Sequence, residues 1–88
     1  MEYSSEDMDR IMTASKLGQS DVARLLGVSR ITVYNWLKGG EPHKLLRTKV
    51  HKLFGALDRA TEAGDLPILD RKLDERNTKL VAIVRRHL

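Results

Sequence analysis

The sequence predicts an all-α fold with about five helices. Apolar residues recur at intervals of three and four residues in five separate segments, which is the spacing of one helix face. Glycine, proline or serine separates these segments, and no stretch alternates apolar and polar residues as a half-buried strand does. The 88 residues are enough for one domain with a small core, because a protein of this size buries only about 60 to 65% of its unfolded surface.

The first helix is expected over about residues 5–15. Ser4 and Asp7 have the spacing of a capping box, in which the hydroxyl and the acidic side chain each bond a free backbone N–H group. Three apolar residues then follow at the spacing of one buried helix stripe: Met8, Ile11 and Met12. Gly18 lies beyond the end of this stripe and separates it from the next helix.

Two short helices follow, over about residues 19–26 and 30–37. Gly27 ends the first of them, because glycine adopts the positive φ that a tight turn needs. Ser29 is a suitable N-cap for the second helix. The pair Gly39-Gly40 ends that helix.

A long fourth helix and a last helix are expected in the second half. Pro42 suits the first turn of the fourth helix. Its apolar stripe repeats in steps of four and three, which is typical of a coiled coil but fits packing against the first three helices at least as well. The stripe consists of Leu46, Val50, Leu53, Leu57 and Ala60, widened by Leu45 and Phe54. After a break at residues 64–67, Ile68 and Leu69 should fold back as apolar anchors, and the last helix should cover about residues 74–87.

Residues 19–38 have the pattern of a helix-turn-helix. Two helices that cross at a steep angle need a small residue where they touch, a residue that tolerates positive φ in the turn, and apolar residues that pin the second helix. Ala23, Gly27, Val33 and Trp36 meet these needs. The tryptophan is therefore expected to be structural.

The net charge of +4 is concentrated on this motif. Residues 1–21 hold two basic and five acidic residues, residues 22–52 hold seven and one, and residues 53–88 hold seven and six. The three segments therefore carry −3, +6 and +1. A polyanionic partner is favoured, because basic side chains that neutralise phosphates release counterions, although a solvated basic face fits the charge alone.

The outward face of residues 30–37 carries residue types that read DNA. Arg30 can bond guanine O6 and N7, Asn35 can bond adenine N6 and N7, and Ile31 can pack on a thymine methyl group. In a plain helical bundle the isoleucine would be a minor surface defect. Eight further residues are expected to contact the phosphate backbone: Gln19, Ser20, Ser29, Thr32, Tyr34, Lys38, Lys44 and Arg47.

Residues 6–40 resemble the helix-turn-helix of phage-repressor and Cro-type (XRE-like) transcriptional regulators, which have a lambda-repressor-like core. The matching residues are Gln19, Ala23, Gly27, Ser29, Val33, Trp36 and Gly39. The resemblance implies that Gln19 braces a phosphate and that the three base-reading residues named above face the bases. Gly18 replaces the more usual Ser or Thr cap, and the resemblance says little about residues 43–88.

These features predict a sequence-specific double-stranded DNA-binding transcriptional regulator, most simply a repressor that covers a promoter. One recognition helix reads only about four or five base pairs, so a homodimer on a palindromic operator is expected, with half-sites about 34 Å apart. Residues 1–88 would form a single domain with a dimerisation segment over about residues 57–88. The dimer interface is expected to use apolar residues left over once the core is filled: Leu57, Leu80, Ile83, Val84 and Leu88.

Other function classes are weaker or stay open. The chain has no cysteine, its three histidines lack partners at metal-ligand spacing, and it has no glycine-rich phosphate loop or nucleophile with a base, so we expect no metal, no cofactor and no enzymatic activity. Without a membrane span or a signal-peptide pattern, a cytoplasmic protein is expected. The alternative is an antitoxin or anti-activator whose C-terminal helices bind a partner protein, with DNA binding for autoregulation. An accessory role in recombination or replication also stays open.

Overall fold

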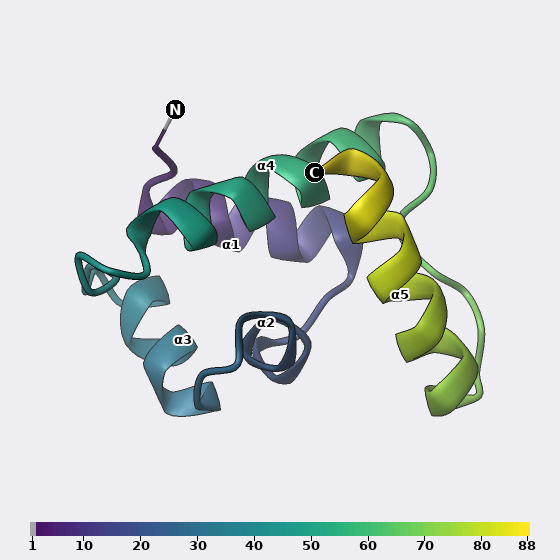
Figure 1. Ribbon diagram of the computed structural model, residues 1–88, viewed down its shortest axis with the longest axis horizontal. Coiled ribbons are helices and arrows are strands. Elements are labelled where there is room, and N and C mark those ends of the chain that lie inside the picture. Colours follow the sequence, from purple (N-terminus) through teal and green to yellow (C-terminus); the bar gives the residue numbers. More distant parts are fainter. Residues whose placement is uncertain (1) are drawn as a thin grey trace.

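The computed structural model describes residues 2–88 of the chain. These residues contain five helices joined by short connections (Figure 1). They are α1 (Ser5–Ser15), α2 (Gln19–Leu26), α3 (Arg30–Leu37), α4 (Arg47–Glu62) and α5 (Leu73–His87). No strand occurs among these residues, so the all-α prediction is confirmed. The first three helices have the bounds that the sequence predicts.

Side chains cap the starts of the first three helices. The Ser4 hydroxyl accepts the Asp7 N–H and the Asp7 carboxylate accepts the Ser4 N–H, both at 3.1 Å, which confirms the capping box. At the start of α2 the Asp21 carboxylate accepts the Gly18 N–H at 2.9 Å, which is the half of a capping box that does not need a side chain on the N-cap residue. The Ser29 hydroxyl caps α3 by accepting a backbone N–H at 3.1 Å.

The connection between α2 and α3 depends on a single left-handed residue. Gly27 has a φ of 71° and its N–H bonds the carbonyl of Ala23. A side chain would have open space at this position, so the constraint comes from the backbone conformation and not from a neighbouring atom. The turn sets the angle at which α3 leaves α2.

The core lies between two levels of helices. Figure 1 shows α4 and α1 across the top, α2 and α3 below them, and α5 descending along the edge farthest from α3. Ile11, Val33, Phe54 and Leu57 come from three of these helices and are each 1% exposed or less. Trp36 is 3% exposed, which confirms its structural role.

The start of α4 differs from the prediction. Pro42 is buried in the connection after α3, and the helix begins five residues later at Arg47. Residues 44–46 form a turn closed by a bond of 2.8 Å from the Leu46 N–H to the His43 carbonyl. This turn brings Leu46 against the core and leaves Leu45 84% exposed, so Leu45 does not widen the apolar stripe.

The segment before α5 also corrects one expectation. Ile68 is partly buried against the core as predicted, but Leu69 is 79% exposed and anchors nothing within residues 2–88. Leu66, at 2% exposure, is the main anchor of this segment. The chain then turns into α5, which packs along α4.

The expectation that the apolar residues of the last helix are left over is wrong. Leu57, Leu80, Ile83 and Val84 are 0%, 1%, 9% and 6% exposed within a single chain, because α5 packs its apolar side on α4 and completes the core. Of the five residues expected at a dimer interface, only Leu88 is exposed, at 65%. A second copy would therefore have to use a different face of α5.

Two classes of feature are missing from the described part of the chain. Within residues 2–88, no helix combines the length and hydrophobicity that a bilayer crossing demands. The same residues contain no cluster of histidine and acidic side chains that could bind a metal ion.

Candidate nucleic-acid interface

The helix α3 has one buried face and one free face. Val33 and Trp36 are 1% and 3% exposed and hold α3 on the core. Arg30, Ile31 and Asn35 are all exposed, and Ile31 reaches 69%. The three residues expected to read bases are therefore all accessible, and the apolar isoleucine has no place in this chain's own core.

The C-terminal end of α3 is held tightly by backbone contacts. The Gly40 N–H bonds the Asn35 carbonyl at 2.8 Å, and a Cβ on Gly40 would lie 2.8 Å from the same oxygen. Only glycine fits so close to the helix end, and Gly39 has a φ of 103°. The Ser5 hydroxyl of α1 also donates to the Trp36 carbonyl. These bonds fix the orientation of α3 relative to α1.

The N-terminal cap of α3 leaves one hydroxyl proton free. The Ser29 and Thr32 hydroxyl oxygens lie 2.8 Å apart, so one hydroxyl donates to the other. Ser29 also accepts the Thr32 N–H. Because only one of the two hydroxyl protons is used, the other can donate to a phosphate oxygen.

The N-terminal end of α2 faces an open hollow next to α3. Gln19 and Ser20 line this hollow of about 590 Å³ together with Arg30. The first N–H groups of a helix have no partners within the helix and attract phosphate. The fold thus brings two of the expected phosphate contacts and one expected base contact together.

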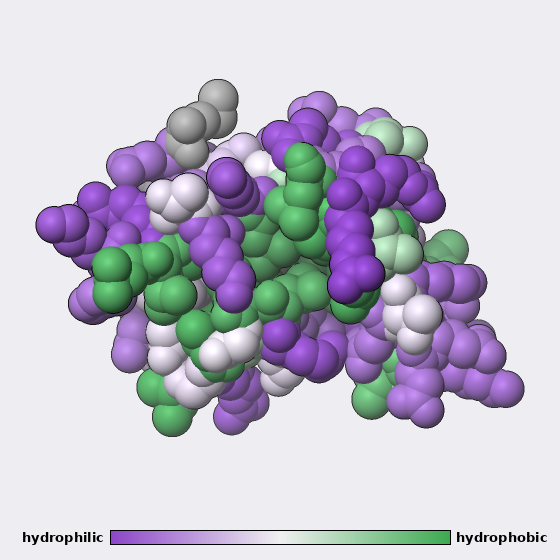
Figure 2. Space-filling view, viewed as in Figure 1, coloured by the Kyte–Doolittle hydropathy of each residue, from purple (hydrophilic) through white to green (hydrophobic). Residues whose placement is uncertain are grey.

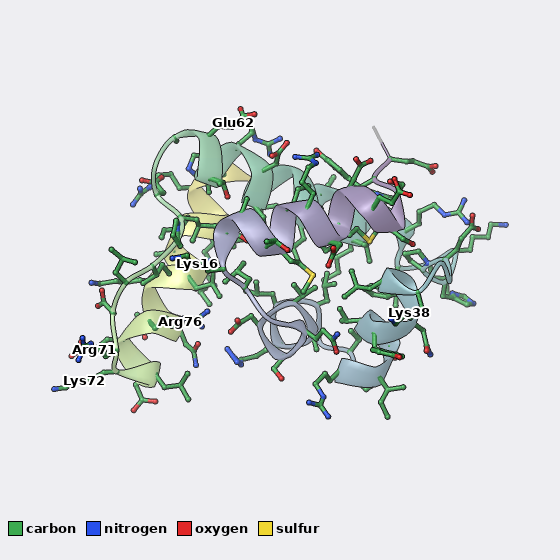
Figure 3. The ribbon with its side chains drawn as sticks, turned by 180° about the vertical axis from the view of Figure 1, so that it is seen from behind. Lys16, Lys38, Glu62, Arg71, Lys72 and Arg76 are labelled. Carbon is green, nitrogen blue, oxygen red and sulfur yellow. The ribbon has the colours of Figure 1, made fainter. Side chains whose placement is uncertain are left out.

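Lys16 lines the same hollow, and the sequence did not single it out. It follows α1 in a left-handed conformation with a φ of 55°, and its side chain is exposed. Figure 3 shows Lys16 at the end of α1 and Lys38 at the end of α3. A cation at the rim of the hollow adds to the attraction for phosphate.

The remaining basic residues have different surroundings. The Lys38 ammonium lies 5.4 Å from the centre of the Tyr34 ring, a cation–π distance that keeps both side chains beside α3. Lys44 is exposed in the connection after α3. Arg47 lies at the start of α4, forms an exposed ion pair of 3.7 Å with Glu41, and lines hollows away from Gln19. The fold does not bring Arg47 to the hollow beside α2.

An ion pair joins α5 to the start of α2. The Arg76 guanidinium donates two bonds to the Asp21 carboxylate, at 2.8 and 3.0 Å, and both side chains are largely buried, at 18% and 11% exposure. Arg24 of α2 adds a bond of 2.9 Å to Asn77 of α5. Figure 3 shows Arg76 reaching from α5 toward α2.

This pair changes the charge next to the hollow. The hydrogen bonds from Arg76 lower the pKa of Asp21 below its ordinary value, against the opposing effect of burial, and the carboxylate raises the pKa of Arg76. Asp21 is therefore ionised, but its charge is neutralised by Arg76. Without Arg76, only the 3.5 Å contact with Arg24 would offset this carboxylate, which lies two residues from Gln19 and would repel a bound phosphate more strongly.

One of three comparisons with known proteins found a match, and it agrees with this geometry. Residues 11–40, from the middle of α1 through the two glycines after α3, match the model of the homeodomain-like domain family. The match supports a helix-turn-helix of the DNA-binding kind in these residues. The match covers 30 of the 88 residues and leaves α4 and α5 outside. The searches of curated proteins and of solved structures found no match.

Proposed function

We propose that this protein is a sequence-specific double-stranded DNA-binding transcriptional regulator that inserts α3 into the major groove. The exposed face of α3, with Ile31 69% exposed, is the observation that carries the proposal. The major groove is about 12 Å wide and admits one helix. An exposed apolar side chain between polar ones suits its floor, where thymine methyl groups alternate with hydrogen-bonding edges.

Three side chains would read the sequence. Arg30 would bond the two acceptors of a guanine, Asn35 would bond an adenine, and Ile31 would contact a thymine methyl group. The backbone contacts would come from Lys16 and from the residues that the sequence indicates around α2 and α3. Because these contacts are the same for every base pair, they would position α3 without selecting a sequence.

The regulator would act as a homodimer of the phage-repressor type on a palindromic operator. The α3 helix of one chain covers only about four or five base pairs, which is too short to specify a site in a genome. Two copies with recognition helices about 34 Å apart would double the site. Occupying a promoter would then repress transcription by excluding the polymerase.

Selection of bound sequences from random duplex DNA tests the proposal. The expected product is a half-site of about four or five base pairs, repeated as an inverted repeat with a spacing near one helical turn. Arg30→Ala should relax the preference at one position of each half-site. Recovery of unselected sequences, with unchanged binding to all duplexes, would show that α3 does not read bases.

A second candidate is a partner-binding protein that uses its DNA contacts for autoregulation. Exposed leucines before and at the start of α5 favour it, because Leu69 and Leu73 are 79% and 62% exposed. Purification from the native host without DNA separates the two candidates. A stoichiometric second protein would support the partner-binding function, whereas a single polypeptide species would favour the regulator that acts alone.

A further inference from the structure

The outer face of α5 carries a second stripe that lies outside the hydrophobic core of residues 2–88. The stripe consists of Asp74, Thr78, Val81, Arg85 and Leu88, which follow one another in steps of four, three, four and three residues. All five are exposed, including Val81 at 41% and Leu88 at 65%. This is the spacing of the contact positions in a pair of packed helices.

The charges on the stripe are arranged with opposite signs at its two ends. Asp74 lies in the first turn of α5 and Arg85 in the last turn. Within residues 2–88 neither side chain has an ion-pair partner. In a parallel pair of α5 helices like charges would face each other, whereas in an antiparallel pair each aspartate would face the partner's arginine.

Resting on the homodimer of the proposed function, we propose that a second copy of this chain docks on this stripe, with the two α5 helices antiparallel. A two-fold axis between Lys79 and Leu80 places Thr78 of each copy opposite Val81 of the other. The same axis places Asp74 opposite Arg85 at both ends. This arrangement produces four pairs of facing residues across the interface. Two pairs consist of small side chains and two consist of oppositely charged side chains.

The surroundings of the stripe are suited to such a contact. Val81, Arg85 and Leu88 also line a hollow of about 300 Å³ between α2 and α5, floored by apolar side chains such as Leu25. Figure 2 shows hydrophobic surface in the middle of this face, between α4, α2 and α5, bordered by hydrophilic side chains. Side chains from the rim of a second copy can enter this hollow and enlarge the interface.

The position of α5 keeps DNA binding possible in the pair. In Figure 1, α5 lies at the edge of the molecule farthest from α3. Pairing through α5 therefore leaves α3 of each copy uncovered. The helix is 15 residues long, or about 22 Å, so the interface is small and the dimer is expected to be weak in the absence of DNA.

Sedimentation of the full chain without DNA, from about 1 µM to about 1 mM, tests the interface. The native chain should dimerise within this range. Asp74→Arg and Arg85→Asp should each weaken dimerisation by about tenfold, because two attractions become two repulsions. Combining both substitutions in one chain should restore it. The matched control is Glu75→Arg, which makes the same charge change in the same helical turn but outside the stripe, and it should dimerise like the native chain.

Several results would overturn the interface. These are a native chain that stays monomeric throughout, an Asp74→Arg chain that dimerises normally, a Glu75→Arg chain that is weakened equally, or a double variant that is not restored. Circular dichroism checks that each variant is folded. Half-site DNA binding by Asp74→Arg should persist, so loss of the dimer is distinguishable from failure of the DNA-binding proposal.

Disulfide capture gives a second readout if a charge variant fails to fold. The chain contains no cysteine, so Thr78→Cys and Val81→Cys chains can be prepared separately and mixed under mild oxidation. The antiparallel register predicts a mixed disulfide dimer as the main product. Two homodimeric products with little mixed dimer would contradict that register.

Discussion

Residues 4–40 and residues 41–88 differ in the range of the hydrogen bonds that hold their helices. In the first region the caps join residues three apart, as in Ser4 with Asp7 and Ser29 with Thr32. In the second region the stabilising bonds join residues that are far apart in the sequence, since Arg76 bonds Asp21, 55 residues away. Local bonds define the starts of the first helices, the bond from Ser5 to Trp36 links α1 to α3, and bonds of still longer range attach α5 to α2.

The difference also concerns what each region exposes. The free face of α3 is polar with one isoleucine, while the second region exposes scattered leucines and a stripe along α5 with opposite charges near its two ends. The free face of α3 suits a polyanion that presents a pattern of hydrogen-bonding and methyl groups, as the base edges in the major groove do. The surface of the second region suits another protein surface, including a second copy of the chain.

The largest expected effect tests whether the two regions form one unit. Phe54 of α4 is completely buried in the core that both regions share. Phe54→Ala should cost about 3 to 5 kcal/mol of unfolding free energy, because it removes contacts and leaves a cavity. Urea unfolding should remain a single transition by both tryptophan fluorescence and circular dichroism. Two separate transitions would show that the regions are stable independently.

Two glycine substitutions distinguish a loss of stability from a change in the orientation of α3. Gly27 and Gly64 both have positive φ, 71° and 84°, with open space where a side chain would lie. Gly27→Val and Gly64→Val should each cost about 1 to 3 kcal/mol. At a temperature where both chains are folded, only Gly27→Val should weaken DNA binding, because only that turn orients α3. Equal losses of affinity by titration would contradict this assignment.

The contact of Arg76 with Asp21 should contribute about 2 kcal/mol to the free energy of unfolding. Asp21→Asn should remove much of it at pH 7. Because the folded pKa of Asp21 lies below its ordinary value of 3.8, the contribution is fully present above that value and is lost as the pH falls below it. The difference in urea midpoint between native and Asp21→Asn chains should therefore shrink from pH 7 to pH 3. A constant difference would mean that the carboxylate charge is not what the pair uses.

The same contact makes a prediction about DNA affinity. Arg76→Met should weaken binding to the operator, because the Asp21 carboxylate near Gln19 loses the closer of its two cationic partners and keeps only the 3.5 Å contact with Arg24. Adding Asp21→Asn to that variant should recover most of the affinity. If the double variant binds as weakly as Arg76→Met, the contact acts through folding alone.

The smallest effects distinguish reading from positioning within the first region. Arg30→Ala should cost about 1 to 3 kcal/mol of binding free energy on the operator and little on unrelated DNA. Lys44→Ala should weaken binding to all sequences alike and lower the slope of log affinity against log salt by about one. Identical behaviour of the two variants in salt titrations would show that Arg30 does not read a base.

The helix-turn-helix was predictable because its determinants lie close together in the sequence. Ser4, Gly27 and Ser29 each act on a neighbouring turn, so their spacing was sufficient to place three helices. The exposed positions of Ile31 and Asn35 followed from helical period. The hollow beside α2 was not predictable in full, since Lys16 lines it through a positive φ that its own residue type does not require.

The sequence alone determined an all-α chain, the bounds of three helices and the face of α3 that is free to meet DNA, because these depend on periodicity and on bonds within one helical turn. Only the tertiary structure decided the partner of each apolar stripe. It assigned Leu57, Leu80 and Val84 to the core of one chain, since a stripe defines a face but not what covers it. It likewise revealed the contact of Arg76 with Asp21, whose two halves meet only when α5 has folded back over the start of α2.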